Sequence, residues 1–221
     1  MDEPIIVVER KYLFDQESAV AERLDFQGIE QSEDRIARLE QNMASHYQIM
    51  RRGDAEDNPS YKQTITYAVI RRDQAYFAYE RLGGGAESRL HGKLSIGVGG
   101  HMNAVEEAEN FQQLLAQNLR RELSEELQIK TAEPFQTKTL GFINDDQTEV
   151  GAVHLGLLVI IDLPASASVS VKEKEKLAGK WLTREQLIEP ETFTRLENWS
   201  AFAAQILSAS NPYKPVRGAG N

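Results

Sequence analysis

Five large apolar residues recur at intervals of four, and this stripe constrains the fold more than any other feature of the chain. It predicts one long helix whose broad, slowly drifting apolar face must be buried, most simply against a sheet. Strand-like segments flank the helix on both sides, and a final amphipathic helix is expected over residues 191–207. This order favours an α+β fold, built as an α/β/α layered domain. The stripe consists of Phe111, Leu115, Leu119, Leu123 and Leu127.

The limits of the helix and of the neighbouring strands follow from local signals. Asn103 and Glu106 have the spacing of a capping box, so the helix is expected to begin there. A hairpin and a short strand that runs into Gly99 and Gly100 are expected before the helix, and two strands after it. The expected strands are residues 63–71, 75–79, 94–98, 139–143 and 152–161.

The 221 residues suit one domain with additions. Residues 1–60 are expected to form an N-terminal extension, with a short strand over 5–8, a helix capped by Ser32 and a polar loop over 51–60. Residues 61–210 form the main domain. Residues 211–221 are expected to be a flexible tail.

Composition excludes several classes of function. The net charge of −9 argues against stable nucleic-acid binding, and the absence of cysteine excludes disulfides, thiolate metal sites and a Cys nucleophile. The N-terminus is acidic where a signal peptide is basic, and the longest apolar stretch, residues 155–161, is too short to cross a bilayer. We expect a soluble, cytoplasmic protein that does not enter membranes.

Three glutamates near the end of the predicted helix carry the chemistry. Glu122, Glu125 and Glu126 have the i, i+3, i+4 spacing that places side chains on one strip. Like charges this close repel one another, and a hard divalent cation such as Mg²⁺ relieves that repulsion. Arg121 is positioned to orient Glu125 by an ion pair. Such a charged run is often only a solvated helix face, but the turn at Gly100 favours a metal site because glycine allows close approach to the main chain.

The order Gly100, Glu106 and then Arg-Glu-Leu-x-Glu-Glu over residues 121–126 resembles the Nudix box, G-x5-E-x7-R-E-U-x-E-E-x-G-U, in which U is a bulky apolar residue. Fourteen residues rather than seven separate Glu106 from Arg121, and Gln128 occupies the usual glycine position. We expect the extra residues to lengthen the helix by about two turns. The strings YKQTITYAVI, RLHGKLSIGVGGH and EVGAVHLGLLV are similar to a little-characterised Nudix branch of predicted phosphoesterases.

The resemblance implies a Nudix-type sandwich with a mixed sheet and a Mg²⁺- or Mn²⁺-dependent pyrophosphatase. Such an enzyme hydrolyses the diphosphate linkage of a nucleoside or other small organic diphosphate. The implied metal ligands are Glu122, Glu125, Glu126 and the Gly100 carbonyl. The implied catalytic residues are Glu125, Glu126, Arg121 and a later glutamate, Glu149. Substrate phosphates are expected to meet Arg81, Arg89 and Lys93.

Several alternatives remain open from the residues alone. A Nudix fold also serves as a catalytically silent ligand-binding or regulatory module, and the helix has a purely structural reading. Glu149 fits a polar hairpin loop equally well. His154 is expected to be a buried histidine that is hydrogen-bonded to the backbone. The N-terminal extension, with its amphipathic helix, offers an interface for a homodimer.

Overall fold

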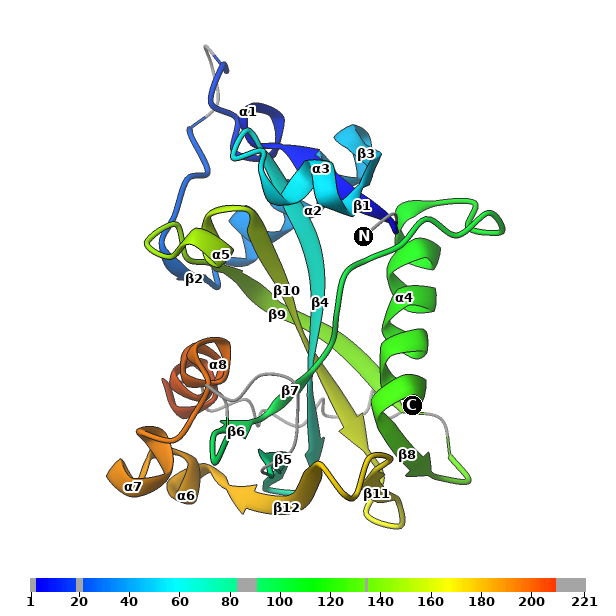
Figure 1. The fold of residues 1–221 in the computed structure, drawn as a ribbon, viewed down its shortest axis with the longest axis vertical. Helices are drawn as coiled ribbons and strands as arrows, with labels where there is room; N and C mark the ends of the chain where they lie inside the picture. The colour runs from blue at the N-terminus through cyan, green and yellow to red at the C-terminus, as the bar shows by residue number, and fades with distance from the viewer. Residues whose placement is uncertain (1–2, 19–21, 83–90, 134, 210–221) are drawn as a thin grey trace, which may run out of the picture.

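A mixed sheet lies at the centre of the protein (Figure 1). The computed structural model describes residues 3–18, 22–82, 91–133 and 135–209. Within these ranges no helix is both long enough and apolar enough to cross a membrane. The main path of the sheet runs β12 (Leu177–Thr183), β5 (Ala75–Arg81), β4 (Tyr61–Arg72), β10 (His154–Leu163), β9 (Gln136–Asn144) and β2 (Gly28–Glu30).

The two central strands explain why helices cover both faces of the sheet. β4 and β10 pair in parallel and are buried along most of their length. Ala68 and Ile70 of β4 belong to one core cluster, whereas Tyr67 and Val69 belong to the other. α4 (Phe111–Glu126) and α2 (Glu33–His46) pack into the first cluster, and α8 (Asn198–Ala209) packs into the second. The expected α/β/α sandwich is confirmed.

The helix α4 buries the predicted stripe but begins later than expected. All five stripe residues are buried. The cap is Asn110, whose side chain accepts a hydrogen bond from the backbone N–H of Gln113 at 3.0 Å. The prediction of a cap at Asn103 was therefore wrong, and the extra residues of the box form a loop and not two helical turns. Asn103 instead exchanges hydrogen bonds with the Asn118 side chain.

The predicted strand over 94–98 is divided between two partners. β6 (Leu94–Ser95) pairs with β5, and β7 (Gly97–Val98) pairs with β4. Beyond β7 the chain continues along β4, because Thr66 N–H donates to the Gly100 carbonyl at 3.0 Å and Met102 N–H donates to the Thr64 carbonyl at 2.9 Å. The glycine turn therefore lies against the middle of β4.

The N-terminal extension adds strands to the same sheet. β1 (Pro4–Glu9) pairs with β4 on one side and with β3 (Tyr47–Arg51) on the other. The predicted helix ends at His46, because the residues after it extend to pair with β1. The predicted polar loop contains α3 (Arg52–Glu56), and α1 (Arg10–Leu13) follows β1.

A buried ion pair joins this extension to the main domain. Lys62 of β4 is fully buried, and its ammonium group donates to Asp146 at 2.7 Å and to two carbonyl oxygens. Arg10 donates to both oxygens of the same Asp146 carboxylate at 2.8 Å. Burial lowers the pKa of Lys62 to about 8. One carboxylate therefore pairs with two cations from different parts of the chain.

The predicted final helix is interrupted. α6 (Arg184–Ile188) and α7 (Pro190–Phe193) precede α8, and between α7 and α8 the chain forms a turn at Thr194 and Arg195 and a bridge from Leu196 to Leu94. Leu94 causes this break, since its N–H donates to the Arg195 carbonyl and its carbonyl accepts from Glu197 N–H. The remaining elements are α5 (Glu149–Ala152) and a two-stranded sheet of β8 (Leu127–Lys130) and β11 (Ser168–Val171). The expected tail, residues 211–221, lies outside the described residues.

Candidate active site

The Glu122 carboxylate lies directly against the glycine turn. A Cβ atom on Gly100 would stand 2.6 Å from Glu122 Oε1 and 2.7 Å from Oε2. Glu122 is 7% exposed, and Arg121 Nη2 forms an ion pair with its Oε1 at 2.8 Å. Of the three glutamates of the strip, Glu122 is the one that the structure places beside Gly100. The Gly100 carbonyl accepts one hydrogen bond, from Thr66 N–H, which leaves a second lone pair.

Glu126 lies one helical turn after Glu122 on α4, and Tyr79 links it to the Gly97 carbonyl of β7. The Tyr79 hydroxyl lies 3.3 Å from Glu126 Oε2 and 3.1 Å from the Gly97 carbonyl, with the Tyr79 ring fully buried between them. The i, i+4 spacing places the two carboxylates on the face that meets the sheet. Sequence reasoning did not identify Tyr79, because its partner is 47 residues away in the chain.

Glu125 occupies the outer side of the strip. Its side chain is 55% exposed, and Arg121 Nη1 lies 3.4 Å from its Oε1. Arg121 also donates to the His101 carbonyl at 2.8 Å and to Asn118 Oδ1 at 3.2 Å. The predicted orienting role of Arg121 thus has a geometric basis, since one guanidinium group contacts both Glu122 and Glu125 and the backbone beside Gly100.

Asn118 is a structural residue of the site that the sequence analysis missed. It is buried, accepts from Asn103 N–H at 2.7 Å and donates to the carbonyls of Asn103 and Leu114 at 2.9 Å. These bonds fasten the loop that follows Gly100 to α4. The available signal was an asparagine within the apolar stripe, one position before Leu119, where a polar side chain needs partners.

The ionised forms of Glu122 and Glu126 are electrostatically unfavourable in the metal-free protein. Burial raises the pKa of Glu122, and burial together with the charge of Glu122 raises the pKa of Glu126 to about 7. Arg121 offsets part of this cost at Glu122, and Tyr79 offsets part of it at Glu126. Two crowded, desolvated carboxylates beside a free carbonyl lone pair are a donor set that suits Mg²⁺ or Mn²⁺. The residues present therefore fit a divalent cation.

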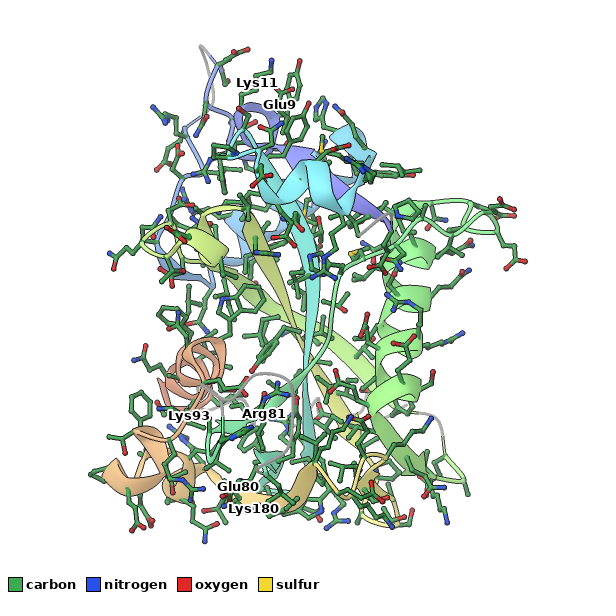
Figure 2. All side chains as sticks on the ribbon, viewed as in Figure 1. Glu9, Lys11, Glu80, Arg81, Lys93 and Lys180 are labelled. Carbon is green, nitrogen blue, oxygen red and sulfur yellow. The ribbon has the colours of Figure 1, made fainter. Side chains whose placement is uncertain are left out.

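The predicted phosphate-binding residues lie at the β5–β6 end of the sheet. Arg81 N–H donates to the Lys93 carbonyl at 3.0 Å, so the two residues are neighbours (Figure 2). The Arg81 guanidinium forms an ion pair with Glu197 at 2.5 Å and lies over the Tyr79 ring. Lys93 donates to the Thr194 carbonyl. The Tyr79 ring thus separates Arg81 from Glu126. Arg89 lies outside the described residues.

Two further predicted glutamates lie apart from the strip. Glu149 is exposed on the first turn of α5, and none of the contacts found among the described residues joins it to Glu122 or Glu126. Glu106 is exposed in the loop before α4. The position of Glu106 follows from the late start of the helix at Phe111, which leaves this residue outside the helix.

A pair of histidines borders the glycine turn. His101 follows Gly100 directly, and its Nε2 lies 3.1 Å from Nε2 of His154. His154 is buried and its Nδ1 lies 2.5 Å from the Val150 carbonyl, so the prediction of a buried, backbone-bonded histidine is confirmed. Burial lowers the pKa of both imidazoles, to about 4 for His101. Both rings are therefore neutral at pH 7.

Comparison with solved structures defines the class of fold. The crystal structure of Tm1382, provisionally assigned to the Nudix hydrolases, matches with a TM-score of 0.73 and 24% identity, covering 94% of this chain and 99% of that chain. The protein thus has the Nudix fold, with the acidic strip on its helix α4. The chain belongs to the family of Protein YmaB from Bacillus subtilis (strain 168), with 48% identity over 207 residues, 94% of this chain and 98% of that protein. No protein-family model matches.

Proposed function

We propose that the protein is a Mg²⁺-dependent hydrolase that cleaves the diphosphate linkage of a nucleoside or other small organic diphosphate, by attack of water on phosphorus. The observation that carries this proposal is the Glu122 carboxylate buried against Gly100, with the part-buried Glu126 one helical turn away, where burial and the charge of Glu122 raise its pKa. A structural helix edge has no reason to bury two like charges one turn apart, because each loses hydration and repels the other.

The roles of the residues follow from their positions. Glu122, Glu126 and the Gly100 carbonyl hold the cation, with Glu125 completing the set from the outer side. A bound divalent cation neutralises charge on diphosphate oxygens and lowers the pKa of coordinated water. Arg121 fixes Glu122 and Glu125 relative to the turn. Tyr79 fixes the position of the Glu126 carboxylate through its hydroxyl group.

Proton removal from the attacking water requires a carboxylate whose pKa is close to the working pH. Glu126 has a pKa of about 7 only in the metal-free protein, so it serves as the base only when it is not itself bound to the cation. Glu125 is exposed and is the second candidate. Glu149 on α5 is a third candidate, which acts as the base if substrate binding brings α5 toward the strip. Its replacement by Gln separates these readings.

Arg81 is the cation best placed to meet a substrate phosphate. Its guanidinium group lies 5.8 Å from the centre of the Tyr79 ring, whose hydroxyl contacts Glu126, and it pairs with the Glu197 carboxylate. A phosphate oxygen could take the place of the Glu197 oxygen that accepts from Arg81 Nε. Lys93 is next to Arg81 and offers a second cation at the same end.

A hydrolysis screen tests the proposal. The full chain is incubated with Mg²⁺ or Mn²⁺ and a panel of nucleoside triphosphates, dinucleotides and nucleoside diphosphate sugars, and released phosphate or pyrophosphate is measured. Glu126→Gln should lower turnover roughly 100-fold or more. Glu106→Gln is the matched control, because Glu106 is an exposed box glutamate away from the strip. Equal rates in the wild type and Glu126→Gln would overturn the assignment. Metal binding without turnover of any compound would favour the silent binding module.

A further inference from the structure

A second group of metal-ligating side chains borders the carboxylate strip and has no part in the proposed hydrolysis. Glu56, His101 and His154 each offer one ligand atom, and these atoms lie within 4.8 Å of one another. The three residues come from α3 of the N-terminal extension, from the segment after β7 and from the start of β10. Three separate parts of the fold thus converge on one point.

The spacing of the two imidazoles matches that of ligands on one ion. His101 Nε2 and His154 Nε2 are 3.1 Å apart. Two nitrogen ligands at the usual zinc distance, arranged tetrahedrally, lie about 3.3 Å apart. A pair of ring nitrogens facing each other this closely has one proton to share at most, which leaves at least one lone pair directed into the cluster.

The protein fixes the orientation of His154 from behind. Its Nδ1 donates to the Val150 carbonyl at 2.5 Å, so the proton is on Nδ1 and the lone pair is on Nε2, facing the cluster. A backbone carbonyl that holds the far nitrogen of a histidine in this way is the usual second-layer partner of a zinc-binding imidazole.

Gln63 supplies an independent indication that something binds here. It is fully buried, and its amide Nε2 has no hydrogen-bond partner among the described residues. Its Oε1 accepts from His101 Nε2–H at 2.8 Å, so an ion that binds here displaces that proton. A buried donor without a partner is costly. An oxygen bound to the ion, from water or from a carboxylate, would accept that hydrogen bond.

Glu56 provides the ligand on the solvent side. It is exposed, and Arg52 one turn earlier holds its Oε1 at 3.2 Å, which orients the carboxylate and leaves the second oxygen to coordinate. Arg52 also lies 3.6 Å from Glu3, so its positive charge is shared between two carboxylates and is not directed only at the cluster.

We propose that Glu56, His101 and His154 form a second cation site, which takes a transition metal of the Zn²⁺ type and leaves a coordination position for water. Imidazole nitrogen suits Zn²⁺ and not Mg²⁺, which distinguishes this site from the all-oxygen strip on α4. A bound ion would link α3 of the extension to β10 of the sandwich, so it would stabilise the folded chain.

Calorimetric titration of the tag-free, full-length protein with ZnCl₂, in buffer with excess Mg²⁺ to saturate the strip, tests this site. The wild type should bind one Zn²⁺ and unfold at a higher temperature with it. Glu56→Gln and His154→Asn should each weaken that binding at least tenfold and remove the thermal shift. Glu56 is exposed, so Glu56→Gln decides the outcome if His154→Asn fails to fold.

Two controls locate the bound ion. His46→Asn removes an exposed histidine that only stacks on Tyr12, and it should bind Zn²⁺ as the wild type does. Glu126→Gln should also retain the site. Wild-type affinity in Glu56→Gln and in His154→Asn would overturn the proposal, as would a loss of Zn²⁺ binding confined to Glu126→Gln.

Discussion

Gly100 and Glu122 are in such close contact that the carboxylate occupies the place where a side chain on residue 100 would begin, 2.6 Å from Oε1. The requirement for glycine is therefore steric and comes from the partner helix. Gly99 faces the other way, where a Cβ would meet the Thr66 carbonyl oxygen at 1.6 Å. Two adjacent glycines thus have different partners, the backbone of β4 and the acidic strip of α4.

Replacement of these glycines should separate stability from metal binding. In Gly100→Ala the obstacle is the end of a flexible side chain, so the fold should persist while the displaced Glu122 weakens Mg²⁺ binding and lowers turnover about tenfold or more. In Gly99→Ala the obstacle is backbone, so the protein should be strongly destabilised. Thermal unfolding and Mn²⁺ titration of both variants measure the contrast. Equal metal affinity in Gly100→Ala and the wild type would contradict the proposed coordination.

Glu126→Gln should stabilise the metal-free protein at alkaline pH. The pKa of Glu126 is about 7 in the folded chain, above its ordinary value of 4.5, so the folded state binds the proton more tightly than the unfolded state does. Stability must then fall as pH rises from 4.5 to 7, by an amount on the order of 2 kcal/mol after allowance for partial exposure. Glutamine removes that loss. Urea unfolding in EDTA at pH 5.5 and pH 8 tests it, and saturating Mg²⁺ should reduce the difference because it stabilises only the wild type.

Tyr79→Phe should shift the pH dependence of metal binding upward. The Tyr79 hydroxyl favours the ionised form of Glu126, so its loss raises the pKa of Glu126 further and protons compete with Mg²⁺ at higher pH. Calorimetric Mg²⁺ affinities across pH 6 to 9 measure the shift. Tyr67→Phe is the control, since the Tyr67 hydroxyl is also buried but contacts Ser200 and no glutamate. A parallel shift in both variants would show that the effect is structural.

Asp146→Asn should destabilise the protein by about 3–5 kcal/mol, because it leaves the fully buried Lys62 ammonium without a counter-charge. Burial opposes ionisation of Asp146, but hydrogen bonds from Arg10 and Lys62 outweigh it and hold the pKa of this carboxyl well below its ordinary value. The stabilisation is therefore complete above pH 4 and is lost as pH falls below it. Asp162→Asn, at a more exposed pair with Arg71, should cost about 1 kcal/mol or less. Urea midpoints compare the two variants.

The sequence predicted those parts of the fold that depend on local periodicity. The stripe from Phe111 to Leu127 is present because its apolar residues repeat at the helical period, and β4, β5 and β10 are present because each is a short apolar run between polar segments. The acidic strip was found for the same reason, since helical spacing alone brings Glu122 and Glu126 to one face.

Features that depend on distant partners were not predictable. The final helix looked continuous because nothing near Leu196 signals that Leu94 will bind the backbone on both sides of it. Asn110 and Asn103 are both good caps, and the choice between them was decided by Asn118, which binds the earlier residue. Glu125 was expected to share the strip equally, but its outward position depends on where the sheet lies relative to α4. Spacing along one chain does not contain that information.

The parallel pairing of β4 with β10 makes the folding of this chain a long-range event. Gln63 lies opposite His154 and Arg72 lies opposite Leu163, so the partners are about ninety residues apart in the chain, and the intervening loop contains the whole of α4. Closing such a loop precedes any gain from the contacts, which predicts slow folding with a high contact order. During synthesis β4 must wait for β10 to leave the ribosome, and until then its hydrogen-bonding edge is open to association with other chains.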